Sequence, residues 1–210
     1  MKIVSVITAR GGSKGIPNKN IIILKGHPLI RYSIIESKKS NVHETWVSTD
    51  SKYIEDISKS YGANVLHRPA EISTDTSTSE AALMHFAENV DFDILVFIQP
   101  TSPLIHHSYI NIGLSMMETY DSVFSAYKEH WVPRWSLDIK PYNWEINNRP
   151  RRQDVKELFV ENGAFYITSK TRLLESKLRY SGNIGIVEMP LNKSYQLDSI
   201  DDLSILEKLL

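Results

Sequence analysis

Short apolar segments alternate with segments of helical periodicity along most of this chain, and this alternation restricts the fold more than any other feature. Residues 94–98 form a fully apolar run, and other apolar runs are rich in Val and Ile. Such runs, separated by helices, are typical of parallel strands covered on both faces. We therefore predict an α/β fold with a mostly parallel sheet and helices on both faces. The predicted strands are 3–8, 45–48, 65–66, 94–98, 122–126, 164–168 and 184–189, and the predicted helices are 29–38, 53–60, 79–89, 110–118, 170–176 and 200–210.

The size and charge of the chain suit one α/β domain. It has 210 residues, 41% of them hydrophobic and 23% charged, so we predict a single domain over residues 1–210. The formal net charge is −1 and the cations gather in two short stretches, so we expect no nucleic-acid partner. The chain has no cysteine, which excludes disulfides and a cysteine nucleophile. It has no long apolar run and no signal-peptide pattern, so we expect no membrane partner and a cytoplasmic location.

The first predicted strand, 3–8, runs into a loop that is typical of a phosphate-binding site. The loop contains three glycines, the cations Arg10, Lys14 and Lys19, and no acidic residue. Glycines let the backbone turn at positive φ and bring N–H groups close to an anion, while the cations supply charge. The loop matches neither the Walker pattern nor the dinucleotide pattern G-x-G-x-x-G. Taken alone, it is explained equally well as a basic turn without function.

Polar residues follow several predicted strands, at the edge of the sheet where open α/β folds bind ligands. They lie in residues 10–20, 49–50, 99–102 and 196–198, and we expect these segments to converge. The segment Gln-Pro-Thr-Ser-Pro at 99–103 offers an amide and two hydroxyls between prolines that restrict the turn. By itself, this segment is better explained as a structural turn.

Five motifs occur in an order and spacing that one enzyme family shares. They are Ala9-Arg-Gly-Gly-Ser-Lys-Gly-Ile-Pro-Asn-Lys-Asn20, Ser48-Thr-Asp-Ser51, His67-Arg-Pro-Ala-Glu71 with Thr74-Asp-Thr-Ser77, Ile98-Gln-Pro-Thr-Ser-Pro-Leu104 and Glu161-Asn-Gly-Ala-Phe-Tyr-Ile167. Together they resemble the cytidylyltransferases that activate sialic acids, the acylneuraminate cytidylyltransferases (CMP-sialic acid synthetases). The resemblance covers nearly the whole chain, and the first motif is closer to this branch than to the related Kdo branch.

The resemblance implies a Rossmann-like fold, a homodimer and a CTP-dependent nucleotidyltransferase of the EC 2.7.7 type. Enzymes of this family transfer CMP from CTP to the anomeric hydroxyl of a nonulosonic acid, such as N-acetylneuraminic, legionaminic or pseudaminic acid, and release pyrophosphate. Their products serve the biosynthesis of cell-surface polysaccharides. Two alternatives stay open: a nucleotidyltransferase for Kdo-like or hexose-phosphate substrates, and a catalytically silent nucleotide-binding homologue.

By motif position, the resemblance gives roles to the residues of the N-terminal loop. Arg10, Ser13 and Lys14 would hold the triphosphate of CTP. Lys19 would neutralise charge near the α-phosphate, and Asn20 would help to recognise the nucleotide. A phosphoryl transfer needs charge stabilisation and alignment more than covalent help, so Arg10 and Lys19 are also predicted catalytic residues.

The resemblance also assigns substrate contacts beyond the loop. Arg68 matches a position near the nucleotide, and the equally weighted alternative is a buried salt bridge from Arg68 to Asp50 or Glu71. Gln99, Thr101 and Ser102 match the segment that faces the acceptor sugar.

The alternation breaks between residues 128 and 158, where tryptophans, prolines and arginines occur without a period. A stretch this long more often has a function of its own than serves as a simple connection. It resembles the family's dimerisation element, which crosses to the neighbouring subunit and lends basic residues to its active site. Arg134 and Arg152 are the candidates, because arginine suits a bidentate grip on the sugar's carboxylate. The alternative is a solvated run of charge.

The family holds Mg²⁺ on an Asp-x-Asp motif near the C-terminus, and this chain departs from that motif. The matching stretch begins at Tyr195, so Gln196 replaces the first carboxylate and Asp198 becomes the predicted metal ligand and a catalytic residue. Mg²⁺ keeps several waters and can be held by few carboxylates plus substrate phosphates, so the amide oxygen of Gln196 can act as a neutral substitute. Asp201 and Asp202 could contribute instead, but they are better explained as the start of the last helix.

Overall fold

The structure is a computed structural model that describes residues 1–13 and 15–210. It contains a seven-stranded sheet in the order β5-β4-β1-β6-β8-β7-β9. Neighbouring strands are parallel except at β8, which runs antiparallel to β6 and to β7. The predicted mostly parallel α/β sheet is therefore confirmed. The strands are β1 (Ile3–Thr8), β4 (Glu44–Thr49), β5 (Asn64–His67), β6 (Ile94–Ile98), β7 (Ser122–Glu129), β8 (Leu158–Ser169) and β9 (Ile184–Glu188).

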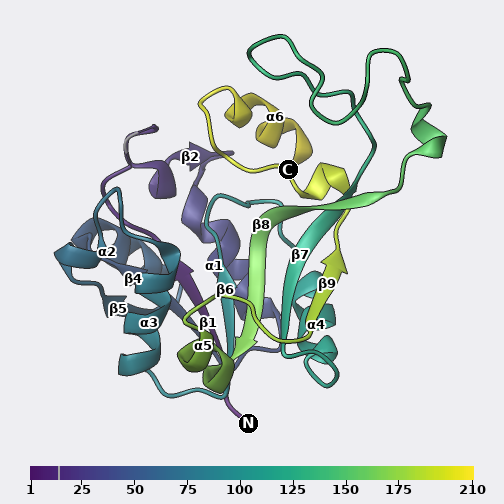
Figure 1. Cartoon of the computed structure of the whole chain (residues 1–210). Coiled ribbons are helices and arrows are strands. Elements are labelled where there is room, and N and C mark those ends of the chain that lie inside the picture. Colours follow the sequence, from purple (N-terminus) through teal and green to yellow (C-terminus); the bar gives the residue numbers. More distant parts are fainter. Residues whose placement is uncertain (14) are drawn as a thin grey trace.

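Helices cover both faces of the sheet, as predicted (Figure 1). One face carries α1 (Leu29–Lys39), α2 (Lys52–Ser60) and α4 (His107–Met116), and the other carries α3 (Ser79–Asn89) and α5 (Lys170–Ser176). Strand β6 serves both faces by alternation. Ile94, Val96 and Ile98 belong to the first core cluster, whereas Leu95 and Phe97 belong to the second. All of β6 is buried, which explains its uninterrupted apolar sequence.

Residues 23–28 form a hairpin that the sequence analysis did not predict. Strand β2 (Ile23–Leu24) pairs with β3 (His27–Pro28), and both turn residues, Lys25 and Gly26, have positive φ, at 46° and 78°. Two consecutive positive φ angles are typical of two-residue hairpin turns. Strands of two residues are too short to show a hydrophobic period, so no periodic pattern in the sequence predicts this hairpin. The hairpin packs against the last helix, α6 (Asp202–Leu209).

Strands β7 and β8 are longer than predicted because they continue as an antiparallel ribbon beyond the sheet. The predicted strands 122–126 and 164–168 extend to 122–129 and 158–169. The register shifts along the ribbon, since Phe124 pairs with Tyr166 but Ala126 pairs with Glu161. Gly163 lies in this irregularity and has a φ of 66°. The irregularity adjoins the cavities described below.

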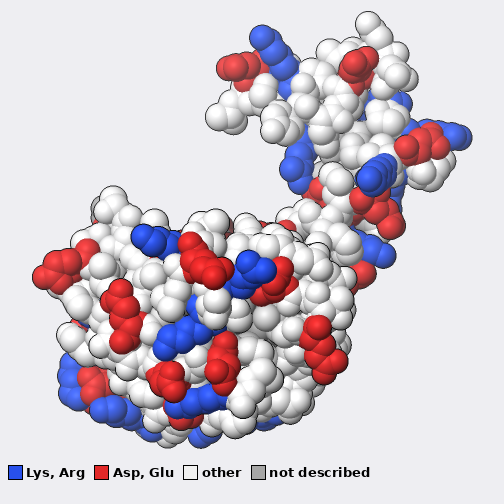
Figure 2. Space-filling model, turned by 60° about the horizontal axis from the view of Figure 1, so that its bottom comes forward, with Lys and Arg blue, Asp and Glu red and all other residues white. Residues whose placement is uncertain are grey.

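The ribbon carries the irregular segment 130–157, which stands away from the body of the molecule (Figure 2). Its regular features are the bridges Trp135–Pro141 and Glu145–Asn148 and a 3₁₀ turn at Arg152–Asp154. The excursion predicted at 128–158 includes this segment. The exposed apolar side chains of the segment are Val132, Trp135, Leu137, Ile139, Tyr142 and Ile146. Among the described residues, no helix has the length and apolar character needed to span a bilayer.

Candidate active site

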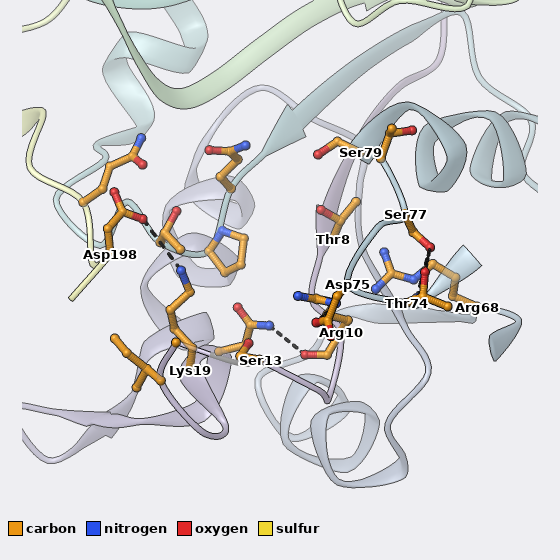
Figure 3. A pocket seen from close by; sticks show the side chains of 18 of the residues that line it. Thr8, Arg10, Ser13, Lys19, Arg68, Thr74, Asp75, Ser77, Ser79 and Asp198 are labelled. Atoms are coloured by element: carbon orange, nitrogen blue, oxygen red, sulfur yellow. Dashed lines mark hydrogen bonds and ion pairs between the residues drawn. The ribbon is translucent and has the colours of Figure 1, made fainter. Parts of the chain in front are cut away.

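A cavity of about 560 Å³ lies at the carboxyl ends of β1 and β6 (Figure 3). Its walls come from the loop after β1, the segment before α3, the turn after β6 and the segment before α6. The predicted convergence of 10–20, 99–102 and 196–198 is therefore confirmed, whereas Thr49 and Asp50 do not line the cavity. The lining residues are Thr8, Arg10, Ser13, Gly15, Ile16, Lys19, Asn20, Arg68, Ile72, Thr74, Asp75, Ser77, Thr78, Ser79, Gln99, Pro100, Thr101, Gln196 and Asp198.

Asp50 supports the N-terminal loop instead of lining the cavity. Its Oδ1 accepts a hydrogen bond of 2.9 Å from the backbone N–H of Gly11. A Cβ on Gly11 would lie only 3.0 Å from the Cβ of Ser51, so the close approach of the two segments favours glycine. Gly11 and Gly12 do not have the positive φ that glycine allows, so the requirement for glycine at residue 11 comes from this close approach. Asn18, later in the loop, has a left-handed backbone at a φ of 55°.

Two predicted cations of the loop point into the cavity, and each faces a carboxylate (Figure 3). Arg10 Nη1 lies 2.7 Å from Asp75 Oδ1, and Lys19 Nζ lies 3.7 Å from Asp198 Oδ1. The buried Asn20 donates from Nδ2 to the carbonyl oxygen of Arg10 at 2.9 Å, which closes the loop on itself. The third predicted cation, Lys14, lies outside the described residues.

Arg68 is a buried cation in the wall of this cavity. The residue is 5% exposed, and its Nε donates to the hydroxyl of Ser73 at 3.0 Å. Burial lowers the pKa of Arg68, and the nearby charge of Asp50 opposes that effect. Among the carboxylates that the structure describes, none forms an ion pair with Arg68, so the alternative of a salt bridge to Asp50 or Glu71 is not observed. A buried guanidinium of this kind favours an anionic ligand.

A row of hydroxyl side chains, for which no individual role was predicted, lines the cavity opposite Lys19 (Figure 3). Thr74, Ser77, Thr78 and Ser79 all line it, and the Thr74 and Ser77 hydroxyls lie 2.8 Å apart. Thr78 caps α3 by accepting from Ala81 N–H at 3.2 Å. The signal was present in the sequence, because hydroxyl residues crowd positions 74–79 immediately before a predicted helix.

A second cavity, of about 580 Å³, adjoins the first and shares Gln99, Gln196 and Asp198 with it. Carboxylates and tyrosines dominate its other polar walls. None of the described residues that line it is a lysine or an arginine. The remaining lining residues are Tyr127, Val160, Glu161, Asn162, Gly163, Tyr166, Leu191, Ser194, Tyr195 and Asp202.

Asn162 ties the segment that bears Gln196 to the sheet. Its Oδ1 accepts from the hydroxyl of Ser125 at 2.6 Å, and its Nδ2 donates to the hydroxyl of Ser194 at 2.9 Å. The Gln196 amide donates from Nε2 to the backbone carbonyl of Asn162. The buried Leu197 adds an anchor, because its N–H donates to the carbonyl of Thr101 at 2.9 Å.

Two residues considered from the sequence differ in placement: Ser102 lies outside both cavities, whereas Asp202 lines the second one. Ser102 is 2% exposed and lines neither cavity, so its predicted contact with the acceptor is not supported by its placement. Asp202 accepts from the backbone N–H groups of Asp198 and Ser199 at 2.9 and 2.7 Å, and these bonds hold its pKa below the usual range. Asp202 therefore shapes the turn before α6, in agreement with the structural explanation given above.

Arg134 and Arg152 lie on the excursion, away from both cavities of the same chain. They line a separate cavity of about 600 Å³, where Arg134 pairs with Glu129 and Arg152 contacts His130. Within one chain, the structure therefore does not bring them to Asp198. Their predicted role across a subunit boundary stays a prediction.

In the part of the chain that the structure describes, one group of three potential metal ligands lies close together, away from the cavities. It consists of Glu36, His106 and His107. Glu36 is already paired with Lys39 at 2.7 Å and bonded to the His107 ring at 2.9 Å. Its Oε2 also accepts from His107 N–H at the start of α4. These partners, together with the positive end of the helix dipole, explain the group as a structural cap.

This chain is similar to known proteins over nearly its whole length. Residues 4–209 match a family model described as Cytidylyltransferase. The chain is 40% identical to an N-acylneuraminate cytidylyltransferase of Oncorhynchus mykiss, over 81% of this chain and 42% of that protein. It is 32% identical to a CMP-N,N'-diacetyllegionaminic acid synthase of Legionella pneumophila, over 100% of this chain and 97% of that protein. The chain thus spans about half the length of several curated relatives and nearly all of another.

The fold is also that of a solved structure. A CMP:2-keto-3-deoxy-manno-octonic acid synthetase complexed with CTP superposes with a TM-score of 0.75, covering 100% of this chain and 98% of that one. The two sequences are 19% identical, so this likeness concerns the fold alone.

Proposed function

We propose a function from one premise: this chain belongs to the cytidylyltransferase family. The proposed reaction transfers CMP from CTP to the anomeric hydroxyl of a sialic acid or a related nonulosonic acid. The hydroxyl oxygen bonds to the α-phosphorus, the bond from that phosphorus to the bridging oxygen breaks, and pyrophosphate leaves. The hydroxyl proton passes to solvent. The names of the curated relatives support this class of substrates, as does the coverage of the legionaminic acid enzyme.

The observation that carries the proposal is the gathering of Arg10, Lys19 and Arg68 around one cavity. A triphosphate brings several negative charges that water would otherwise solvate. Cations already held in place stabilise the charge that develops during phosphoryl transfer without further reorganisation. We assign Arg10 and Arg68, with Ser13, to the triphosphate and Lys19 to the α-phosphate. The hydroxyls of residues 74–79 and the amide of Asn20 offer polar contacts to the nucleoside.

The second cavity is our candidate for the acceptor sugar. It meets the first at Gln99, Gln196 and Asp198, so groups bound in the two cavities would approach one another there. Lys19 lies beside this junction through its ion pair with Asp198. A nucleophile and a phosphate held at one point gain rate from proximity and orientation.

The residues at the junction fit a Mg²⁺ ion. The Asp198 carboxylate and the Gln196 amide are oxygen donors, and the Asp198 side chain is 73% exposed, which leaves room for waters and phosphate oxygens. Mg²⁺ is commonly held in this way, by one or two carboxylates together with substrate phosphates. When bound, the ion would neutralise phosphate charge. The Gln196 amide is fixed to Asn162 through Nε2, so its oxygen remains the donor available to a metal.

We further propose a homodimer in which the excursion completes the acceptor cavity of the partner. A nonulosonic acid carries a carboxylate, yet the described walls of the second cavity contain Glu161, Asp198 and Asp202 and no cation. Arg134 and Arg152 lie instead on a projecting segment with many exposed apolar side chains. Apolar and arginine side chains together are typical of subunit contacts. We also propose a cytoplasmic enzyme that serves the biosynthesis of cell-surface polysaccharides.

The test is pyrophosphate release from CTP with N-acetylneuraminic, legionaminic or pseudaminic acid, with and without Mg²⁺. Release that requires one of these sugars and Mg²⁺ is expected. Release with Kdo or a hexose 1-phosphate alone would replace the proposal by the alternative transferase. Binding of CTP without any release at saturating Mg²⁺ would instead indicate a silent homologue, a reading that the Gln196 substitution favours.

A further inference from the structure

Arg179 lines neither cavity, and no sequence motif drew attention to it. It follows α5 in the segment 177–183, before β9. Its Nε and Nη2 donate to the two carboxylate oxygens of Glu80 at 2.6 and 3.0 Å. Its Cζ also lies 5.6 Å from the ring centroid of Phe97 and 5.1 Å from that of Tyr166. The guanidinium therefore makes a bidentate ion pair and two ring contacts at once.

Each of these three partners belongs to an element that carries a cavity wall. Glu80 lies in the first turn of α3, directly after Thr78 and Ser79, which line the first cavity. Phe97 lies in β6, two residues before Gln99, which lines both cavities. Tyr166 lines the second cavity, and its hydroxyl donates to the carboxylate of Glu161 in the same wall. One side chain thus joins the walls of both cavities.

These contacts depend on the charged forms of both partners. Burial by itself would raise the pKa of Glu80, but the hydrogen bonds from Arg179 and from the Glu80 backbone, together with the charge of Arg179, hold the pKa below its usual range. Burial by itself would lower the pKa of Arg179, but the interactions with Glu80 and, to a lesser extent, with Tyr166 raise it above its usual value. Lysine has neither the planar fork nor the stacking surface of arginine and cannot make the same set of contacts.

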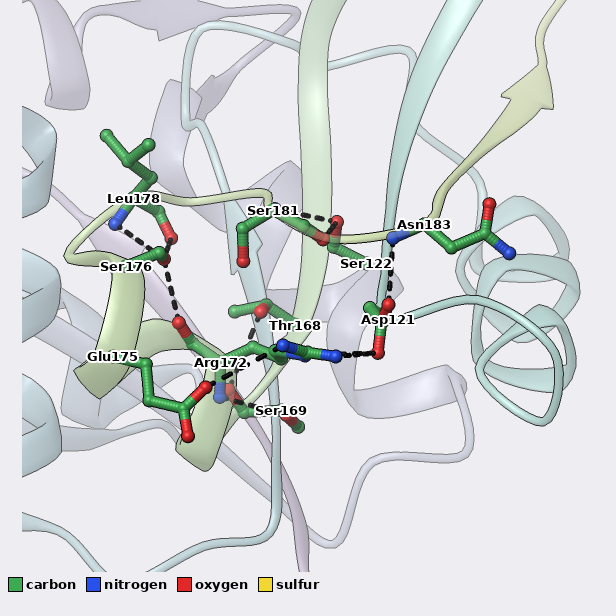
Figure 4. A network of polar contacts seen from close by, with 10 residues as sticks. All are labelled: Asp121, Ser122, Thr168, Ser169, Arg172, Glu175, Ser176, Leu178, Ser181 and Asn183. Carbon is green, nitrogen blue, oxygen red and sulfur yellow. Dashed lines mark hydrogen bonds and ion pairs between the residues drawn. The ribbon is translucent and has the colours of Figure 1, made fainter.

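The backbone on the far side of Arg179 is fixed to the sheet by an independent network (Figure 4). Ser181 N–H donates to the Ser122 hydroxyl at 2.9 Å, and that hydroxyl donates to the Ser181 carbonyl at 2.8 Å. Asp121 accepts from Asn183 N–H at 2.8 Å. The Arg179 side chain is therefore held against α3, β6 and β8 from a fixed base.

We propose that Arg179 is a positioning residue that sets the wall of the nucleotide cavity at α3 against the wall of the acceptor cavity at Glu161. The inference rests on the proposed function of the two cavities. If the spacing of the walls determines how the acceptor hydroxyl meets the α-phosphorus, loss of Arg179 should impair the use of both substrates. Misplacement by about 1 Å can cost a factor of about 10² in rate.

The test compares Arg179→Lys with the matched variant Arg172→Lys. Arg172 forms a similar pair with Asp121 beside the same segment but contacts neither cavity wall. We expect Arg179→Lys to lower kcat about tenfold or more and to raise the KM of both CTP and the acceptor, while Arg172→Lys keeps wild-type kinetics. Tyr166→Phe removes the hydroxyl that bonds to Glu161 but keeps the ring that contacts Arg179, so it should raise the acceptor KM and leave the CTP KM unchanged.

Thermal unfolding of both arginine variants separates positioning from stability. Similar melting temperatures with kinetic loss confined to Arg179→Lys support the inference. Equal kinetics in the two variants, with an active wild type, overturn the inference and leave the proposed function standing. An inactive wild type overturns the proposed function and the inference with it. Should Arg179→Lys fail to fold, the near-isosteric Glu80→Gln takes its place, and an unchanged CTP KM there overturns the inference.

Discussion

Lys19 Nζ lies 3.7 Å from Asp198 Oδ1, so the loop after the first strand meets the segment before the last helix. Asp198 lines both cavities, and Lys19 lines the first. This places a cation and the predicted metal ligand at the point where the two cavities join. The contact is long for a hydrogen bond, and the Asp198 side chain is largely exposed. Its importance should therefore lie in catalysis and little in stability.

Replacing Lys19 with Ala should lower kcat about 10²-fold, because it removes a positive charge aimed at the reacting phosphate. The free energy of unfolding should change by less than about 1 kcal/mol, since exposed ion pairs contribute little. Steady-state pyrophosphate release and urea unfolding measure the two effects. Lys59→Ala is the control, because Lys59 pairs with Glu55 at 2.7 Å on α2, away from the cavities. A kcat in Lys19→Ala equal to that of the wild type would contradict the catalytic role assigned to Lys19.

Replacing Asp198 with Asn should raise the Mg²⁺ concentration at half-maximal rate about tenfold or more, which corresponds to about 1.4 kcal/mol of metal binding. The reason is that Asp198 is the one predicted carboxylate ligand at the junction and Gln196 brings no charge. A Mg²⁺ titration of the rate at saturating substrates measures the shift. Asp201→Asn removes a neighbouring carboxylate that lines neither cavity, so its titration should match wild type. Equal Mg²⁺ titration curves for Asp198→Asn and Asp201→Asn would contradict the proposed metal site at Asp198.

Replacing Gly163 with Ala should destabilise the protein by about 1–2 kcal/mol and also lower kcat/KM. Its φ is 66°, and an added Cβ would lie 2.6 Å from Gln196 Nε2 and 2.7 Å from Gln99 Oε1. Gly26→Ala is the matched control, because Gly26 has a φ of 78° and nothing within 4 Å of an added Cβ. Both variants should lose stability in urea unfolding, but only Gly163→Ala should lose activity. Full activity in Gly163→Ala would show that Gln99 and Gln196 can shift without consequence.

The pair of Glu80 with Arg179 should make the stability depend on pH in the acid range. The pKa of Glu80 lies below its ordinary value of 4.5 in the folded protein, so its charged form is favoured by folding. The contribution is complete above the unfolded pKa and is lost as the pH falls through the folded pKa. The difference in the free energy of unfolding between wild type and Glu80→Gln should therefore be largest at neutral pH and shrink below about pH 4.5. A difference that stays constant down to pH 3 would contradict this.

Mixing two inactive variants tests the shared active site. In a dimer whose sites take Lys19 from one subunit and Arg152 from the other, a hybrid of Lys19→Ala and Arg152→Ala contains one intact site. Random reassortment should then restore about a quarter of the wild-type rate, because half of the dimers are hybrids with one working site each. The mixture is measured by pyrophosphate release after reassortment. Rates that merely average the two separate variants would place Arg152 in its own subunit's site or outside any site.

The class of fold and the place of the site could both be predicted from local sequence patterns. Apolar period and helix period are local properties, so the alternation predicted the sheet and the helices on both faces. The rule that parallel strands end at one edge then brought Arg10, Lys19, Gln99 and Asp198 together without knowledge of the strand order. Charge and glycine content drew attention to the loop, but only the order of the five motifs favoured a function over a basic turn.

How distant segments of the chain meet became clear from the three-dimensional packing alone. The antiparallel direction of β8 and its irregularity at Gly163 depend on pairing across the sheet, which no local pattern encodes. Thr101 lies in the cavity wall, whereas its neighbour Ser102 is buried away from both cavities, and only the packing distinguishes the two. The role proposed for Arg179 depends on its contacts with Glu80, Phe97 and Tyr166, which lie on three other elements, α3, β6 and β8. Periodicity specifies which face of an element is buried, but packing specifies what that face touches.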